Sequence, residues 1–360
     1  MARTVLILGA GASVDAGAPV MNDFLDVSQE LLDNNDCDGN EEDFELVFKA
    51  ISRMRQLHEK VNINVINLEE VFSAIEMGVI LGRFGDIEGD ELARLSKSLK
   101  RVICTTLERT MKFEFAKSDD RLQATEANLR LMGLLKRLEE KNTSKKLRSC
   151  VITFNYDLAI DIAFMFRKID FTYCLDETNE TVYPFLKLHG SLNWGKCRVC
   201  EDGIGSTTIW EGQTNKDGSH CAKGSPGTAS HCGQLTINES VIVSPTWNKL
   251  QQARPLRNIW RRAAQELSEA QEIIIIGYSF PDADIFFKFL YALGSDSNTR
   301  VRRFIIGNPD ESVEEKFRNL IGSGIQQRFE FIPERYNELM LLLNGHQKMT
   351  KKYPKFRPLT

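Results

Sequence analysis

The sequence lacks a long hydrophobic run: no apolar stretch approaches the roughly 18 residues that a membrane-spanning helix needs. It also has little excess charge, because 46 lysines and arginines stand against 50 aspartates and glutamates, giving a net charge of -4. That balance provides no general attraction to nucleic acid, so we expect neither a nucleic-acid site nor a membrane site. The first residues lead directly into a strand-like run without the three-part pattern of a signal peptide, and we expect a cytoplasmic protein.

Cysteine is sparse outside one segment of the chain. Four of the eight cysteines are scattered in apolar contexts that are typical of buried thiols: Cys37, Cys104, Cys150 and Cys174. The other four cluster: Cys197, Cys200, Cys221 and Cys232. In a reducing compartment such a cluster indicates a metal more readily than disulfides.

The cluster's spacing is Cys-x2-Cys, then gaps of 20 and 10 residues, and the first pair is typical of zinc. His220 and His231 each precede a cysteine, and either could replace it as a ligand. Four thiolates are the set that we expect. Such a zinc would be structural, because four protein ligands leave no open position. The alternative is a group of unligated surface cysteines.

Short apolar runs recur along the chain, at residues 5–8, 150–153, 185–188, 241–243, 273–276, 304–306 and 329–332. Most are continuous rather than alternating, which is typical of strands covered on both faces. Helical patterns at 257–270 and 310–321 lie between the later runs. The alternation predicts an α/β fold, a Rossmann-like doubly wound parallel sheet built from residues 1–19, 149–192 and 237–345.

Three segments depart from this alternation. Residues 20–148 show helical patterns, at 67–82, 90–113 and 121–140, and about 130 residues is far longer than a usual crossover, so we expect a helical insertion. Residues 193–236 are too polar to fold on a core of their own, and we expect a small zinc-binding module there. The tail, 346–360, is basic, and we expect a frayed terminus; a phosphate-binding arm is the alternative.

A glycine-rich turn follows the first apolar run. Gly9-Ala10-Gly11-Ala12-Ser13 would expose backbone N–H groups after a buried strand, and the missing side chains would let a pyrophosphate approach them. The next glycine of the usual dinucleotide fingerprint should stand at position 14, where the chain has Val14. Taken alone, the turn fits a ligand site or a plain glycine turn.

Four more polar turns follow later runs, at 153–157, 187–191, 277–282 and 307–310. Asn155 and Asp157 would point the same way from an extended segment, although an Asx turn with a helix cap is the other interpretation. His189 follows a strand, where a neutral imidazole can act as a base, although a lone histidine is often structural. Because parallel strands end at one edge of a sheet, we expect the five turns to converge on one ligand site.

These turns resemble the motifs of the sirtuin family, and more narrowly those of bacterial sirtuin-like proteins of anti-phage defence. Sirtuins carry Gly-Ala-Gly-x-Ser, here 9–13, and Thr-Gln-Asn-x-Asp, here 153–157 with Phe154 in place of glutamine. They carry a catalytic His-Gly, here His189-Gly190, and Gly-Thr-Ser, here 277–279. An adenosine-ribose asparagine corresponds to Asn308, and the family's zinc module follows the His-Gly segment, as the cysteine cluster does here.

The resemblance implies that the Rossmann-like domain binds NAD+ without the usual fingerprint. Gly9, Ala10, Gly11, Ala12 and Ser13 would contact the diphosphate. Asn155 would line the nicotinamide ribose, Asp157 would receive the nicotinamide amide, and His189 would be the catalytic base. On the adenosine side the expected contacts are Gly277, Ser279 and Asn308.

The resemblance also implies chemistry at the nicotinamide–ribose bond. Attack by water gives ADP-ribose and nicotinamide, whereas attack by an acyl-lysine oxygen gives deacylation. Sirtuin deacylases carry Gly-Ile-Pro-x-Phe-Arg after the glycine turn, but residues 17–24 read Gly-Ala-Pro-Val-Met-Asn-Asp-Phe. Since the Phe-Arg pair is absent, we expect an NAD+ glycohydrolase (NADase). A protein deacylase and a non-catalytic nucleotide-binding sensor or scaffold subunit are the alternatives.

The branch of the family implies a setting for that activity. We expect NAD+ depletion during bacterial anti-phage defence, a homo-oligomer, and a separately encoded partner such as an ATPase.

Overall fold

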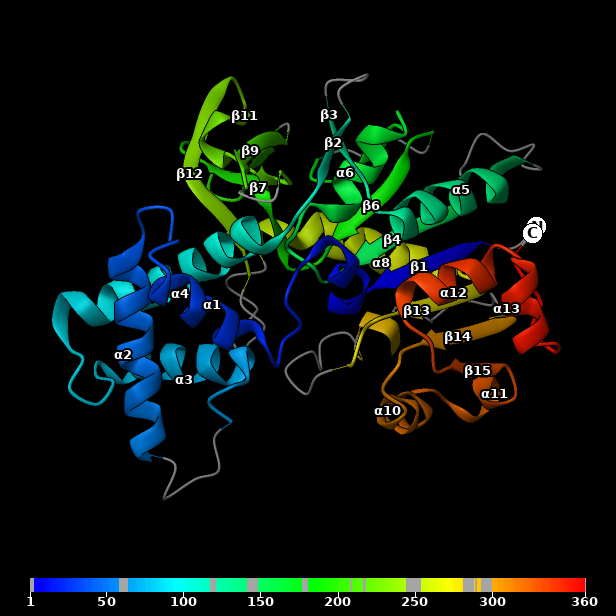
Figure 1. Cartoon of the computed structure of the whole chain (residues 1–360), viewed down its shortest axis with the longest axis horizontal. Helices are drawn as coiled ribbons and strands as arrows, with labels where there is room; N and C mark the ends of the chain where they lie inside the picture. The colour runs from blue at the N-terminus through cyan, green and yellow to red at the C-terminus, as the bar shows by residue number, and fades with distance from the viewer. Residues whose placement is uncertain are drawn as a thin grey trace.

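The computed structural model describes residues 3–57, 64–116, 121–140, 148–176, 181–207, 209–215, 218–243, 254–280, 288, 290–292 and 300–359. Seven strands form the central sheet, and every adjacent pair is parallel (Figure 1). In spatial order they are β15 (Phe329–Ile332), β14 (Arg303–Gly307), β13 (Glu272–Ile276), β1 (Thr4–Leu8), β4 (Ser149–Thr153), β6 (Tyr183–Lys187) and β5 (Phe171–Thr172). The predicted parallel α/β sheet is confirmed.

Alternate residues of the strands point to opposite faces of the sheet, and both faces are covered. Leu6 and Leu8 of β1 belong to one buried cluster, and Val5 and Ile7 belong to the other. Helices α5 (Glu126–Glu140) and α12 (Tyr336–Leu343) contribute to the first cluster, and α8 (Arg257–Glu269) and α10 (Ser312–Leu320) contribute to the second. This double cover explains the continuous apolar runs, because neither side of a strand meets water.

The strand order reverses between β1 and β13. From β1 the chain builds outward through β4 to β6 and β5, and it then returns to add β13, β14 and β15 on the other side. In open α/β sheets the crevice at the carboxyl ends of the strands, at such a reversal, is where ligands bind. The first and fourth predicted turns, 9–13 and 277–282, follow the two strands that flank this point.

A helical insertion separates β1 from β4 (Figure 1). It comprises α1 (Phe24–Asp33), α2 (Glu41–Leu57), α3 (Leu68–Leu81) and α4 (Gly89–Thr110). An antiparallel hairpin follows, formed by β2 (Glu114–Ala116) and β3 (Arg121–Gln123), so the helix predicted at 121–140 begins only at Glu126. That helix, α5, packs on the sheet domain: Asn128 donates to the Ala159 carbonyl of α6 (Ala159–Phe166) at 3.3 Å.

The cysteine-rich segment forms a four-stranded antiparallel sheet and a separate hairpin. The sheet order is β11 (Ser230–His231), β12 (Gln234–Ile242), β7 (Gly190–Cys197) and β8 (Ile204–Ser206), and the hairpin pairs β9 (Trp210–Thr214) with β10 (His220–Lys223). The predicted strand 241–243 is therefore not a strand of the parallel sheet, because residues up to Ile242 pair antiparallel with β7. Gly190 makes this pairing possible, since a Cβ there would lie 1.9 Å from the Val241 carbonyl oxygen.

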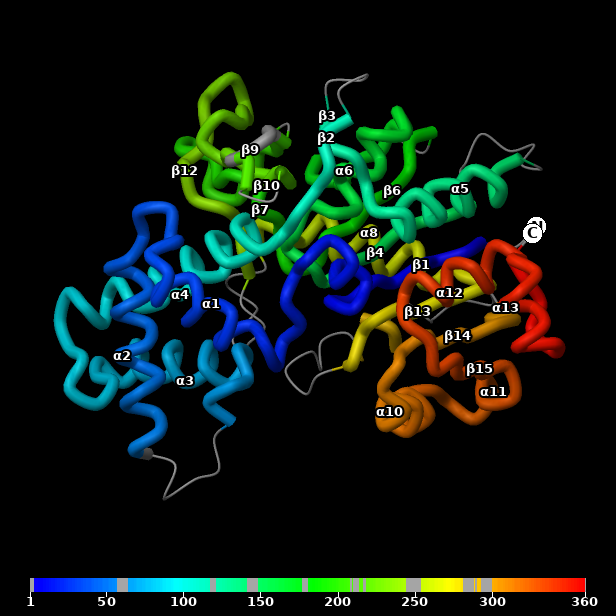
Figure 2. The backbone as a smooth tube through the Cα atoms, viewed as in Figure 1, coloured from blue at the N-terminus to red at the C-terminus, as the bar shows by residue number. Residues whose placement is uncertain are grey.

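The basic tail is folded, which corrects the expectation of a frayed terminus. It forms α13 (Gln347–Lys352), which Figure 2 traces back beside α12. Met349, Phe356 and Leu359 are buried, and Leu359 N–H donates to the Leu343 carbonyl at 3.1 Å. Apolar residues spaced among the lysines anchor the segment, and the count of charges alone did not reveal them. Among the described residues, no helix has the length and apolar character needed to span a membrane.

Candidate functional site

The two glycine turns pack directly against each other at the reversal point. Gly9 N–H donates to the Ile276 carbonyl and Gly11 N–H to the Gly277 carbonyl, both at 2.9 Å. A Cβ on Gly9 would lie 2.6 Å from the Gly277 oxygen, and one on Gly11 would lie 2.7 Å from the Gly277 Cα. Gly277 itself has a φ of +60°, which disfavours a side chain. Close packing of the two turns therefore requires these glycines whether or not a ligand binds.

The N–H groups of the first turn are largely committed within the protein. In addition to Gly9 and Gly11, Ala12 N–H donates to the Gly9 carbonyl at 2.9 Å and Ser13 N–H to the Ala10 carbonyl at 3.0 Å. The bonds of Ala12 and Ser13 close the short helix η1 (Ala10–Ala12), and Ala16 and Gly17 N–H groups close η2 (Val14–Ala16) in the same way. The turn is thus a tightly bonded platform, with fewer open donors for a diphosphate than its sequence suggests.

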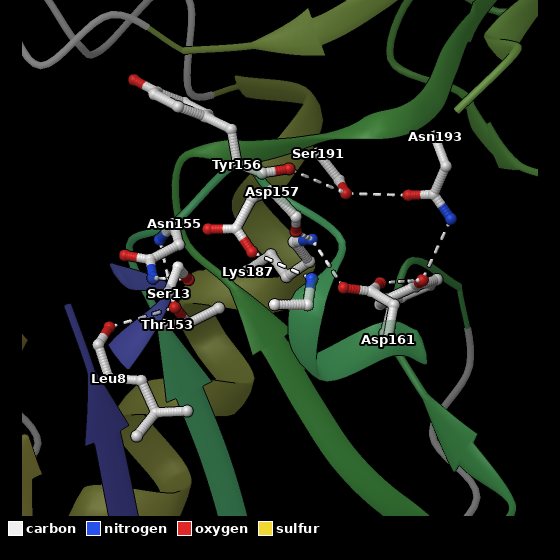
Figure 3. Close-up of polar contacts among 12 residues, drawn as sticks. Leu8, Ser13, Thr153, Asn155, Tyr156, Asp157, Asp161, Lys187, Ser191 and Asn193 are labelled. Atoms are coloured by element: carbon white, nitrogen blue, oxygen red, sulfur yellow. Dashed lines mark hydrogen bonds and ion pairs between the residues drawn. The ribbon is translucent and has the colours of Figure 1, made fainter. Parts of the chain in front are cut away.

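Asn155 connects the turn after β4 to the glycine turn (Figure 3). Its Nδ2 donates to the Gly9 carbonyl and to the Ser13 Oγ, each at 2.9 Å. Its own N–H donates to Thr153 Oγ1 at 3.1 Å, which fixes the direction of the backbone where the strand ends. The predicted convergence of these two turns is therefore observed as a direct side-chain bridge.

Asp157 lies on the same turn and is only 6% exposed. Its Oδ1 accepts from Ala159 N–H at 2.9 Å at the start of α6, so the Asx-turn and helix-cap interpretation describes a bond that is present. Burial raises the pKa of the Asp157 carboxyl, and the nearby Lys187 ammonium and Ser13 hydroxyl partly offset that shift. The group is a carboxyl held away from water, next to the cavity described below.

His189 is buried, at 4% exposure, and main-chain bonds hold it from both sides. Leu188 N–H donates to the Thr153 carbonyl at 2.9 Å, and Val243 N–H donates to the His189 carbonyl at 2.8 Å. The imidazole packs edge-on against Phe154, with ring centroids 5.1 Å apart, and lies 6.0 Å from the Tyr156 ring. Since Phe154 and Tyr156 flank Asn155 in the chain, the two predicted catalytic residues share one neighbourhood.

Phe154 also connects this neighbourhood to the reversal point. Its ring stacks on Tyr278 with centroids 4.5 Å apart and planes 7° apart. Phe154 therefore contributes an aromatic stack at the position that the motif comparison aligned with a glutamine. The turns after β4, β6 and β13 are therefore joined through one ring.

A small cavity opens between the glycine turn, the turn after β4 and the helical insertion. Its polar lining includes Ser13, Asn155 and Asp157, and its apolar lining includes Phe24, Leu68, Ile103 and Leu107. The cavity volume is about 80 Å³, well below the roughly 300–1,000 Å³ of typical small-molecule sites. The enclosed space is therefore too small to hold a whole dinucleotide-sized molecule.

The expected adenosine-side residues lie further along the same edge. Ser279 is exposed, whereas Asn308 is buried and engaged. Asn308 Nδ2 donates to the Tyr278 carbonyl at 3.3 Å, and its Oδ1 accepts from Asp310 N–H at 3.0 Å. Of the turn 277–282, residues 281 and 282 lie outside the described part of the chain.

A buried ion pair lies next to the site, and the sequence alone did not reveal it. Lys187 Nζ lies 3.0 Å from Asp161 Oδ2, and both side chains are 0% exposed. Tyr173 OH donates to the other carboxylate oxygen, and Asn193 Nδ2 donates to Tyr173 OH at 3.1 Å. Lys187 also donates to the Asp157 carbonyl (Figure 3). The sequence signal was a lysine inside the otherwise apolar run 185–188.

The cysteine cluster differs from the predicted set in one member. Ligand atoms of Cys197, Cys200, His231 and Cys232 all lie within 4.8 Å of one another. Cys221 instead lies buried in β10, where its Sγ donates to Asn215 Oδ1 at 3.4 Å. The hairpin holds Cys221 away from the group, and His231, which directly precedes Cys232, occupies the fourth place.

The local geometry of this group fits a tetrahedral zinc site. His231 Nδ1 is buried and makes no hydrogen bond of ordinary geometry with a described residue. A Cβ on Gly203 would lie 2.7 Å from that nitrogen, so glycine leaves the histidine its place. The N–H groups of Cys200 and Val199 lower the pKa of the Cys197 thiol to about 6, which favours the thiolate that zinc binds. With three sulfurs and one nitrogen the coordination shell would be closed, as in structural sites.

Comparison with known proteins gives a limited result. No family profile and no curated protein sequence matches the chain. A structure described as showing the basis for the mechanism and regulation of Sir2 enzymes aligns over 98% of this chain and 93% of its own, at 13% identity and a TM-score of 0.39. A Sir2 complex with a p53 peptide and NAD+ aligns over the same shares, at 15% identity and a TM-score of 0.37. Sequence identities and TM-scores this low do not establish a family or an activity for this chain.

Proposed function

We propose that this chain hydrolyses NAD+ to ADP-ribose and nicotinamide at the carboxyl edge of its sheet. The observation that carries the proposal is the Asn155 side chain, which bridges the Gly9 carbonyl and the Ser13 hydroxyl at 2.9 Å each, where the strand order reverses. A buried carboxyl, Asp157, and a buried imidazole, His189, lie on the turns beside it. The sirtuin-like motifs of the sequence assign these same three residues to the nicotinamide ribose, the nicotinamide amide and the base.

The reaction needs positioning more than acid catalysis. When the bond between the ribose anomeric carbon and the pyridinium nitrogen breaks, its electron pair leaves with nicotinamide, which departs neutral. The water oxygen bonds to the oxocarbenium-like carbon, and the proton that it loses passes to a base. Fixed polar groups stabilise such developing charge and hold the reactants in line. We assign water or ribose positioning to Asn155 and proton acceptance or ribose orientation to His189.

The enclosed cavity of about 80 Å³ is assigned to the nicotinamide end, because Asp157 lines it. The rest of NAD+ would lie over the glycine turns toward Ser279 and Asn308. Zinc at the cysteine cluster would hold the module together, and with a closed ligand shell it would take no part in the reaction.

The proposal is tested with the purified full chain and NAD+, by chromatographic measurement of nicotinamide and ADP-ribose. Equal amounts of both products are expected. Asn155→Ala and His189→Ala should each lower turnover by about 100-fold or more, the scale of a lost catalytic group. The matched controls Asn319→Ala and His346→Ala replace exposed residues of α10 and of the tail, and should retain full turnover.

Folding of each variant is checked by circular dichroism. Turnover that persists unchanged in folded Asn155→Ala and His189→Ala protein would contradict the assignment. An acetylated peptide is offered in parallel. Removal of its acetyl group without release of free ADP-ribose would replace hydrolysis by the deacylase alternative.

Defence by NAD+ depletion is a further part of the proposal, and the motif resemblance alone supports it, as it does the homo-oligomer and the separately encoded partner. Infected bacteria that express the wild-type chain should lose NAD+, and those that express His189→Ala should not. Equal NAD+ levels in the two cultures would contradict the defence role.

A further inference from the structure

Helix α4 lines two different cavities with two different faces. Ile103 and Leu107 face the small cavity beside Asn155. Lys100, Cys104 and Glu108, each four residues apart, line a larger cavity of about 660 Å³ between α4 and the cysteine-rich module. The second cavity is therefore a separate site on a neighbouring face of the helix.

The lining of the larger cavity carries four cationic side chains and two carboxyls, Glu108 and Glu239. Lys97, Lys100 and Arg101 come from α4, and Lys223 comes from β10 across the cavity. Three of these four cations already have carboxylate partners. Arg101 pairs with Asp43 at 2.9 Å, Lys223 with Asp38 at 2.5 Å, and Lys97 with Glu239.

Lys100 is the exception. It forms no hydrogen bond or ion pair with any residue that the structure describes, although it is half-buried in the cavity wall. Burial lowers the pKa of its ammonium, and the nearby Glu76 and Glu239 carboxylates offset that shift only in part. An anion in the cavity would supply the missing partner.

The remaining walls are polar in large part, although Ala93 and Pro226 also line them. They carry four hydroxyls and two amides: Ser96, Thr105, Ser225, Ser240, Asn40 and Asn238. Two of these groups are already engaged within the protein, because Ser240 Oγ donates to the Leu192 carbonyl at 2.8 Å and Asn40 Nδ2 to the Cys37 carbonyl at 3.1 Å. Glu108 adds a carboxyl that accepts from Gly224 N–H at 3.2 Å. Among the described lining residues none is aromatic, so no ring is available to stack a nucleobase. Such walls suit a ligand whose body carries several hydroxyl groups.

We propose that this cavity binds a small phosphorylated metabolite of the sugar-phosphate class, with its phosphate against Lys100 and its hydroxyls against the α4 and β12 walls. A cavity of about 660 Å³ lies within the range of small-molecule sites, roughly 300–1,000 Å³. Lysine is a strong phosphate ligand as a point charge. The inference is independent of the proposed NAD+ hydrolysis.

The test is calorimetric titration of the full chain with ribose 5-phosphate and glucose 6-phosphate, with inorganic phosphate and glucose as comparison probes. We expect saturable binding of at least one sugar phosphate at one site per chain, weaker binding of inorganic phosphate and none of glucose. Lys100→Met should weaken binding by at least about tenfold, since a hydrogen bond to a charged group contributes about 1.5–3 kcal/mol. Lys351→Met, which removes an exposed lysine of α13, should leave binding unchanged.

If Lys100→Met does not fold, Lys223→Met provides a second probe of the same cavity. Lys223 lies on β10, and its ion pair with Asp38 is exposed. It should also weaken binding. Absence of saturable binding by both sugar phosphates would overturn the proposal, and so would binding that both cavity variants leave unchanged. Affinity for inorganic phosphate equal to that for the sugar phosphates would overturn the ligand class.

Discussion

Replacing Lys187 by methionine removes one partner of the buried ion pair beneath the candidate site. The Nζ to Oδ2 distance is 3.0 Å and both side chains are 0% exposed, so Asp161 would keep its buried charge without this counter-ion. Removing one partner of such a pair costs about 3–5 kcal/mol. At roughly 2–4 °C per kcal/mol for a large domain, the melting temperature should fall by about 6–20 °C.

The assay is thermal unfolding followed by circular dichroism, with Lys49→Met as the matched control. Lys49 pairs with Glu91 at 2.6 Å, but their side chains are 40% and 52% exposed, so losing that pair should cost at most about 1 kcal/mol. The double variant Lys187→Met/Asp161→Leu should recover much of the loss, because no unpaired charge remains. A shift for Lys187→Met no larger than that of the control would refute this reasoning.

Three further predictions test other parts of the structure. Gly11→Ala should lower the free energy of unfolding by about 1–3 kcal/mol in denaturant titration, because its Cβ would meet the Gly277 Cα at 2.7 Å; an unchanged value would contradict the packing account. Cys200→Ser should lose bound zinc by elemental analysis whereas Cys221→Ser keeps it, and zinc loss in the second variant would remove Cys221 from its assigned position. Burial raises the pKa of the Glu108 carboxyl from 4.5 to about 7. The folded chain therefore binds the carboxyl proton more tightly than the unfolded chain does. As a result, the free energy of unfolding falls as the pH rises from about 4.5 to 7. Glu108→Gln should therefore raise the melting temperature, relative to wild type, more at pH 8 than at pH 5, and a pH-independent difference would contradict the shift.

The sheet and its edge could be predicted because each strand and the turn after it are encoded by neighbouring residues. A continuous run such as 273–276 has no polar face, which already requires cover on both sides, and polar turns that follow such runs meet by the geometry of parallel strands. Asn155 reaching the glycine turn is one result of that geometry. The resemblance of the motifs suggested the roles of these residues, which remain proposals, and the structure supplied the contacts.

Contacts between distant segments were harder to predict. Whether Cys221 or His231 joins Cys197 depends on how a hairpin folds back, which spacing alone does not determine. The partner of Lys187 is on another helix, and nothing adjacent in sequence marks Asp161 as that partner. Strand run 241–243 was placed in the wrong sheet because a short apolar run does not encode its direction of pairing.

The central claim is that the glycosidic carbon of NAD+ is held between the Asn155 amide and the His189 imidazole. A crystal structure of the full chain with a non-hydrolysable NAD+ analogue tests this most directly. The account predicts the nicotinamide ribose in contact with both side chains and the nicotinamide amide at Asp157. An analogue bound away from these turns, or a ribose that touches neither side chain, would contradict it.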